Sequence, residues 1–303
     1  MKREIIDAHV HLITPGMIHD FRERATTLFP GFGGAIVENF EKRFEGKTPE
    51  QLFGNDLATQ AAEWLKAMDS SGVARAVFFP ISERLEDVRD FVAKAPDRFI
   101  GYAFLNDPPS KTAPERLRAA VKNYGFRGLK LYPPIQMFNP CDKALFPLYE
   151  EARSLGIPIT FHFGITLAAF ADYRYADPID LQLPLKLFPD LNFIIAHFGA
   201  GYFREACLLG FHNQNVFLDT SGTNNWRDYT PERTPLFDVF KRAVEIYSAE
   251  RIIFGTDTVI RAGVGYRAAI KAEQEAVVDG LPISDSEKDL IMGGNARRLY
   301  LGG

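Results

Sequence analysis

Short apolar runs alternate with helical repeats along the whole chain. Runs of seven to nine residues that are rich in β-branched and aromatic side chains are typical of buried strands, and eight occur, at residues 4–12, 75–81, 99–105, 126–132, 158–164, 192–199, 216–222 and 251–258. A three- and four-residue apolar spacing follows each run and predicts helices at residues 56–72, 84–96, 114–125, 144–156, 183–190, 202–214, 236–248 and 266–280. Strand and helix therefore alternate eight times.

Runs that are apolar on both faces, such as NFIIAHFG and RAVFFPI, are typical of parallel strands covered by helices on one side and by a barrel core on the other. We therefore predict an α/β fold, a single (β/α)8 TIM barrel over residues 1–303. A doubly wound open sheet is the alternative. That fold usually carries a glycine-rich GxGxxG turn after its first strand, and IIDAHVHL leads into none.

Residues 12–55 separate the first predicted strand from the first predicted helix, which is too long for an ordinary βα loop. We interpret this segment as an irregular insertion over the barrel mouth. Its glycines, Gly31, Gly33 and Gly34, and its aromatic residues would suit either a lid or a packed excursion.

The first predicted strand, IIDAHVHL, carries two histidines one position apart. Because residues i and i+2 of a strand share a face, His9 and His11 should project together, opposite Ile6, Ala8 and Val10. One histidine in an apolar strand is more often a structural residue, but two in register can hold one metal ion.

Three further polar residues stand near the ends of other predicted strands, where barrel enzymes place their catalytic groups. His162 is near the end of the fifth strand, His197 of the sixth and Asp257 of the eighth. Three imidazoles and one carboxylate would suit Zn²⁺, with Mn²⁺, Fe²⁺ or Co²⁺ as substitutes, and would leave one position open for water. His197, if it is not a ligand, would be placed to polarise a substrate or to move a proton.

Composition narrows the classes of partner. A formal net charge of −4 and a pI near 5.9, without a dense Lys/Arg run, give no electrostatic footprint for nucleic acid. No run approaches the roughly 20 apolar residues of a membrane span, and the N-terminus makes a poor signal peptide. Cys141 and Cys207 lie far apart and outside any CxxC pattern. We expect a cytoplasmic protein without a nucleic-acid or membrane partner.

The motifs IDAHVHL, FHFG, AHFG and FGTD, closed by IMGGNARRLYLG, resemble the amidohydrolase-related (amidohydrolase 2) family of metal-dependent TIM-barrel hydrolases and decarboxylases. The resemblance covers residues 5–301. It implies that His9, His11, His162 and Asp257 bind one divalent metal, and that His197 acts as an acid, a base or an electrophilic group. In such enzymes the aspartate matching Asp257 often also carries a proton.

Two features bear on which branch of the family the chain resembles. Binuclear relatives in the wider superfamily use a carboxylated lysine from the fourth strand, and Lys130 lies on the fourth predicted strand. We favour Lys130 as a substrate contact or a buried ion-pair partner, with a second metal as the alternative. Some decarboxylating relatives begin with Glu-x-His where this chain has His9-x-His11, which favours hydrolysis without excluding decarboxylation.

Further candidate substrate residues lie in predicted βα loops. Tyr132 and Trp226 would suit a planar substrate, although most aromatic residues of a large barrel are core. Arg174, Arg227 and Arg261 could bind a carboxylate bidentately, although each alone is more often a solvated loop arginine. Together they favour a small acidic substrate.

Three functions remain open. We expect metal-dependent hydrolysis of a small carboxylated lactone, amide or related carbonyl compound. The alternative is nonoxidative decarboxylation of a small aromatic-derived carboxylic acid. A barrel used only for binding would have an incomplete set of metal ligands, whereas every expected type is present here. The aromatic-rich insertion also suits contact with a second copy, as in a homodimer.

Overall fold

In a computed structural model, residues 3–222, 226–231 and 233–302 are described. Every strand pair is parallel, and the strands form two sheets, ordered β10-β1-β2-β3 and β4-β5-β6-β7-β8-β9. The strands are β1 (Ile6–His11), β2 (Arg75–Phe79), β3 (Phe99–Gly101), β4 (Ala103–Phe104), β5 (Leu129–Leu131), β6 (Ile159–Phe161), β7 (Phe193–Ile195), β8 (Val216–Asp219), β9 (Ile252–Ile253) and β10 (Thr258–Val259).

Two interrupted strands join the sheets into a barrel. The predicted third strand is divided at Tyr102 into β3, which pairs with β2, and β4, which pairs with β5. The predicted eighth strand is divided into β9, which pairs with β8, and β10, which pairs with β1. Between these halves the Ala8 amide donates to the Phe254 carbonyl at 2.9 Å. Counted with β3 and β4 as one strand and β9 and β10 as another, the eight strands each have a neighbour on both sides, as the predicted TIM barrel requires.

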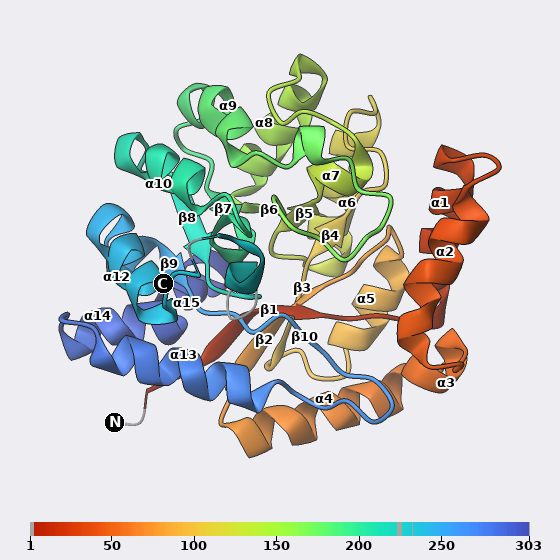
Figure 1. Cartoon of the computed structure of the whole chain (residues 1–303), viewed down its shortest axis with the longest axis horizontal. Helices are drawn as coiled ribbons and strands as arrows, with labels where there is room; N and C mark the ends of the chain where they lie inside the picture. Colours follow the sequence, from red (N-terminus) through yellow and green to blue (C-terminus); the bar gives the residue numbers. More distant parts are fainter. Residues whose placement is uncertain (1–2, 223–225, 232, 303) are drawn as a thin grey trace.

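Helices follow the strands and surround the barrel (Figure 1). Within the described residues, no helix is both long and apolar enough to cross a membrane. The helices are α1 (Pro15–Leu28), α2 (Gly33–Glu41), α3 (Pro49–Phe53), α4 (Leu57–Ser71), α5 (Leu85–Val92), α6 (Ala113–Tyr124), α7 (Pro133–Gln136), α8 (Phe146–Leu155), α9 (Gln182–Leu187), α10 (Phe203–His212), α12 (Leu236–Tyr247), α13 (Ala268–Gly280), α14 (Asp285–Asp289) and α15 (Asn295–Leu301).

The face assignment predicted for β1 is wrong at Ile6 and Ala8. Both belong to an inner apolar cluster with Phe79, and the Phe79 ring lies 4.3 Å from that of His9. Val10 belongs instead to the cluster that packs under the helices. The pairing of β1 with β2 shifts register within β1, and such a bulge breaks the two-residue alternation. The two histidines therefore face the same side as Ile6 and Ala8.

The insertion is helical, so the irregular loop expected over residues 12–55 is corrected to α1, α2, a 3₁₀ turn (Lys42–Phe44) and α3. Thr14 caps α1 and Thr48 caps α3, each followed by a proline at the first helical position. A threonine cap followed by proline is a common way to begin a helix, because proline has no amide hydrogen to leave unpaired.

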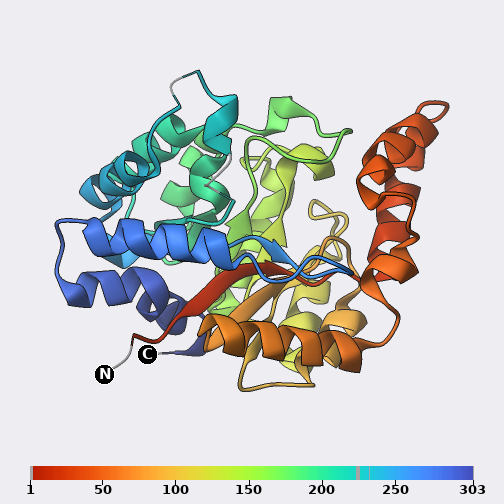
Figure 2. The same cartoon turned by 60° about the horizontal axis from the view of Figure 1, so that its bottom comes forward.

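The insertion packs on the rim formed by the carboxyl ends of the strands. Phe21 and Ala25 of α1 cluster with Ile135, which follows β5, and with Phe170, which follows β6. Ile81, which follows β2, packs against a second cluster from the insertion. Figure 2 shows α1, α2 and α3 standing together beyond the end of β1.

Candidate metal centre

His9, His11 and Asp257 converge at the carboxyl end of the barrel. The Oδ1 atom of Asp257 lies 3.1 Å from His11 Nε2 and 3.8 Å from His9 Nε2. One possible ligand atom from each residue lies within 4.8 Å of the others. Asp257 has φ 59°, and its amide donates to the His9 carbonyl at 2.8 Å. This left-handed residue lies between β9 and β10, and its amide hydrogen bond holds it beside β1.

Hydrogen bonds fix the tautomers of both histidines. The Nδ1 atom of His9 contacts the carboxylate of Asp219, and Nδ1 of His11 lies 3.2 Å from the Phe79 carbonyl. Because these oxygens only accept, each Nδ1 carries the hydrogen and each Nε2 presents a lone pair.

The buried His9 Nε2 is left without a hydrogen-bond partner among the described residues. The Nε2 lone pairs of His9 and His11 and the Asp257 carboxylate are all acceptors, and they lie close together with no hydrogen to share. A divalent cation would satisfy all three, so this donor set fits a metal.

His162 and His197 form a second pair next to this group. His197 donates from Nδ1 to the Ser221 carbonyl at 2.8 Å, and its Nε2 atom lies 3.0 Å from His162 Nδ1. The His197 and His9 ring centroids are 4.9 Å apart. His197 thus lies beside the three converging residues, and His162 lies on the side of His197 where its Nε2 atom points. The ligand role of His162 stays a prediction.

Burial dominates the electrostatics of the site. It lowers the pKa of His9, His162 and His197, and the Lys130 charge lowers all three further. Burial alone would raise the pKa of Asp257, but the contact with His11 and the nearby histidine rings hold it well below its usual range. His9, His162 and His197 are therefore neutral and the Asp257 carboxylate is ionised near pH 7, which is the protonation that metal binding requires.

Lys130 projects from β5 into the same region. Its Nζ atom is buried, has no hydrogen-bond partner among the described residues, and lies 4.8 Å from the centroid of the Phe79 ring. Burial lowers its pKa to about 8, against the opposing charges of Asp219 and Asp257. An unpaired cation beside a metal centre is well suited to binding an anionic group of a substrate.

The other predicted substrate residues lie in different surroundings. The Tyr132 hydroxyl is 2.9 Å from His162 Nε2, so Tyr132 borders the site. Trp226 is buried in the apolar cluster under the helices. Arg174 pairs with neighbouring Asp172, Arg227 donates to the Thr234 carbonyl, and Arg261 donates to the Arg43 carbonyl. None of these contacts of Trp226 or of the three arginines reaches the histidines, and their substrate roles stay predictions.

Three residues around His9 were not among the predicted site residues. Asp219 orients His9, the Ser221 hydroxyl lies 2.9 Å from His9 Nδ1, and a Cβ atom on Gly255 would lie 2.8 Å from His9 Cβ. Asp219 is the last residue of β8 but lies in the middle of the predicted run VFLDTSG, so the strand-end criterion that found Asp257 did not select it. Nothing in the sequence marks the Gly255 contact.

The sequence of this chain matches a known protein family. The sequence model of the amidohydrolase family matches residues 6–301. The chain belongs to the amidohydrolase family. This confirms the resemblance drawn from IDAHVHL and the later motifs.

Individual relatives of this chain differ in reaction. A 2-keto-4-carboxy-3-hexenedioate hydratase from Sphingobium sp. is 26% identical over 237 residues, which span 68% of this chain and 66% of the hydratase. A 5-carboxyvanillate decarboxylase from Novosphingobium aromaticivorans with bound manganese has a TM-score of 0.69 at 14% identity and covers 98% of this chain and 97% of its own. A probable 2-pyrone-4,6-dicarboxylic acid hydrolase from Acinetobacter baumannii has a TM-score of 0.62 at 17% identity, covering 98% of both chains. These two structures share the fold.

Replacing Gly255 by alanine should disturb the support of His9. The added Cβ atom would meet His9 Cβ at 2.8 Å and Asp219 Oδ1 at 3.0 Å, so we expect the free energy of unfolding to fall by about 1–3 kcal/mol. Denaturant unfolding of metal-free protein measures this. Gly265→Ala is the matched control, since a Cβ atom there meets nothing within 4 Å. Equal stability of the two variants would contradict the tight contact.

Asp219→Asn should weaken metal binding. The substitution removes the negative charge that holds the Nδ1 hydrogen of His9, and loss of such a partner typically costs about 10- to 100-fold in metal affinity. Competition with a chromophoric chelator for Zn²⁺ gives the affinity. Asp190→Asn, an exposed change elsewhere, should leave it unchanged. An unaltered affinity in Asp219→Asn would show that Asp219 does not support a ligand.

Proposed function

We propose that this amidohydrolase-family member is a metal-dependent hydrolase of a small carboxylated lactone, amide or related carbonyl compound. The observation that carries the proposal is the convergence of His9 Nε2, His11 Nε2 and Asp257 Oδ1, three acceptors with no proton to share. These residues would hold one divalent cation, of which we favour zinc, with manganese, iron or cobalt as substitutes. When bound, the cation supplies Lewis acidity for a carbonyl oxygen and a lowered pKa for water.

Asp257 has the position of a base for this reaction. Its Oδ1 atom faces the two histidines, and its Oδ2 atom lies 3.6 Å from Arg267 Nη1. A carboxylate held ionised in this way can accept a proton from attacking water and later return it to the leaving group. Arg267 was not a predicted site residue and would limit the motion of the carboxylate.

His197 would assist at the developing oxyanion. Its Nδ1–H donates to the Ser221 carbonyl, so its Nε2 atom is the one that can gain a proton. That atom now lies 3.0 Å from His162 Nδ1. We assign His197 the task of moving a proton or polarising the substrate, with His162 either as its partner or as a fourth ligand.

Lys130 would bind the carboxylate of the substrate near the reacting centre. Because its Nζ atom is buried and lacks a hydrogen-bond partner among the described residues, an incoming anion would gain an ion pair without breaking one. Tyr132, beside His162, would border the same space. These contacts support a carboxylated substrate over a neutral one.

Hydration is a second candidate, because the Sphingobium relative is a hydratase that matches two thirds of this chain at 26% identity. Hydration and hydrolysis both require water made nucleophilic beside a base. Decarboxylation is the third candidate, and in that reaction Asp257 or His197 would deliver a proton to carbon. The three reactions are separated by their products: a ring-opened acid, an alcohol or carbon dioxide.

Asp257→Asn should abolish turnover with little loss of fold. We expect kcat to fall by about 10²–10⁴-fold, because the base is lost while the side chain keeps its size. The assay uses a panel of carboxylated lactones and amides, with carbon dioxide release followed in parallel. Asp285→Asn, an exposed change on α14, is the control. Full activity in Asp257→Asn would contradict the assignment, and carbon dioxide as the only product would favour the decarboxylase.

Lys130→Met should stabilise the fold while impairing substrate binding. Folding lowers the pKa of Lys130 to about 8 from 10.5, so its charged form costs stability below pH 8, and this cost fades as pH rises toward 10.5. We expect the variant to gain about 1–4 kcal/mol of unfolding free energy at pH 7, less at pH 10, and to show a raised KM. Loss of stability at pH 7 would mean that Lys130 has a structural role.

A further inference from the structure

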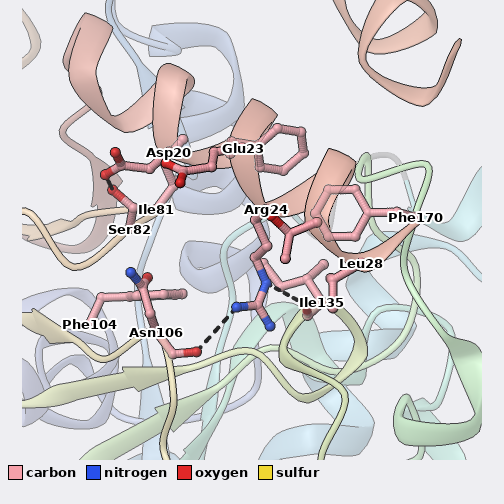
Figure 3. A pocket seen from close by; sticks show the side chains of 12 residues that line it. Asp20, Glu23, Arg24, Leu28, Ile81, Ser82, Phe104, Asn106, Ile135 and Phe170 are labelled. Atoms are coloured by element: carbon pink, nitrogen blue, oxygen red, sulfur yellow. Dashed lines mark hydrogen bonds between the residues drawn. The ribbon is translucent and has the colours of Figure 1, made fainter. Parts of the chain in front are cut away.

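A cleft of about 370 Å³ lies between helix α1 of the insertion and the rim of the barrel (Figure 3). Its barrel side is formed by residues that end or follow strands: Ile81 and Ser82 after β2, Phe104 in β4 and Asn106 after it, Ile135 after β5, and Phe170 after β6. All of these lie on the face of the barrel where β1 ends at His11. The cleft therefore opens on the catalytic side of the barrel.

One cation, Arg24, reaches into this cleft from α1. Its Nε atom donates to the Ile135 carbonyl and its Nη1 atom to the Asn106 carbonyl, both at 3.2 Å (Figure 3). No hydrogen bond or ion pair joins it to a carboxylate within the described residues. Burial lowers the pKa of the guanidinium, against the opposing charge of Asp107. Arg24 is thus a partly desolvated cation whose hydrogen-bonded partners are neutral.

The carboxylates of the cleft do not neutralise Arg24. Asp20 accepts two hydrogen bonds from Arg84 and one from Ser82, each at 2.8 Å. Glu23 is exposed, where water screens its charge. The remaining walls are largely apolar, including the rings of Phe21, Phe104 and Phe170. Such a cleft suits a flat apolar body that carries one carboxylate.

We propose that Arg24 binds a carboxylate of the substrate that lies remote from the metal centre, and that the cleft holds the planar part of the molecule. This inference rests on the proposed function and deepens it, because it assigns a dicarboxylate with one acidic group at Lys130 and another at Arg24. In this proposal a residue of the insertion binds the second carboxylate, in place of the three arginines predicted from sequence, Arg174, Arg227 and Arg261.

The competing role of Arg24 is structural, since its two hydrogen bonds tie α1 to the loops after β4 and β5. Binding measurements on the full chain separate the two roles. The probes are isophthalate, a planar dicarboxylate, and isophthalamide, its neutral counterpart. Calorimetric titration is carried out on chelator-treated protein, so that no metal contributes to the affinity.

For isophthalate we expect Arg24→Gln to weaken binding at least 10-fold. Arg24→Lys should weaken it less, because lysine keeps the positive charge but lacks the paired donors of the guanidinium. Arg22→Gln, on the same helix and paired with Glu41, is the matched control and should bind as the native chain does. Isophthalamide should bind no more weakly to Arg24→Gln than to the native chain.

Three outcomes would overturn the inference: no isophthalate binding by the native chain, equal affinities of the native chain and Arg24→Gln, or equal losses for isophthalate and isophthalamide. Equal losses for the two probes would show that Arg24 only holds α1 in place. Failure of the proposed function looks different, since no tested ester or amide would then be hydrolysed while the Arg24-dependent affinity persisted.

Discussion

The candidate site depends on the contact between the Asp219 carboxylate and Nδ1 of His9. It joins β8 to β1 across the barrel interior and fixes the tautomer of His9, so that the Nε2 lone pair faces Asp257. Gly255 leaves room for this contact, and the left-handed backbone at Asp257 brings the carboxylate beside β1. Without Asp219, the Ser221 hydroxyl would be the hydrogen-bond partner of Nδ1, and because a hydroxyl can donate or accept it would not fix the tautomer of His9. A parallel barrel makes the arrangement possible because it brings all strand ends to one rim.

The sequence predicted the barrel well because parallel strands buried on both faces leave a clear record of apolar runs, and all eight runs became strand segments. Local irregularities were missed. The bulge in β1, which turns Ile6 and Ala8 to the same side as the histidines, and the break at Asp257 depend on pairing between distant strands. The helices of the insertion have a local signal in Thr14-Pro15 and Thr48-Pro49, which the sequence analysis did not use.

Some residues of the candidate site could likewise be predicted from sequence, and others could not. His9, His11 and Asp257 were predictable because each lies near the end of a predicted strand, and a shared rim makes such residues neighbours. Loop residues have no comparable rule, and the contacts of Arg174, Arg227 and Arg261 lie away from the histidines. Arg24 could not be placed from sequence, because its position depends on how α1 packs on Ile135 and Phe170. Family membership fixes the fold, whereas the relatives' different reactions leave the chemistry to be decided by such contacts.

The central claim is that His9 and His11 hold one divalent metal. Elemental analysis of protein purified without chelator or affinity-column metal tests it most directly, with a His9→Ala/His11→Ala variant beside it. The control is His19→Ala/His212→Ala, which removes two exposed histidines on α1 and α10. The native protein and the control should contain near one divalent metal per chain, and the first variant none. No metal after reconstitution, or metal retained without His9 and His11, would contradict a metal site at these residues, and two metals per chain would bring Lys130 into the centre.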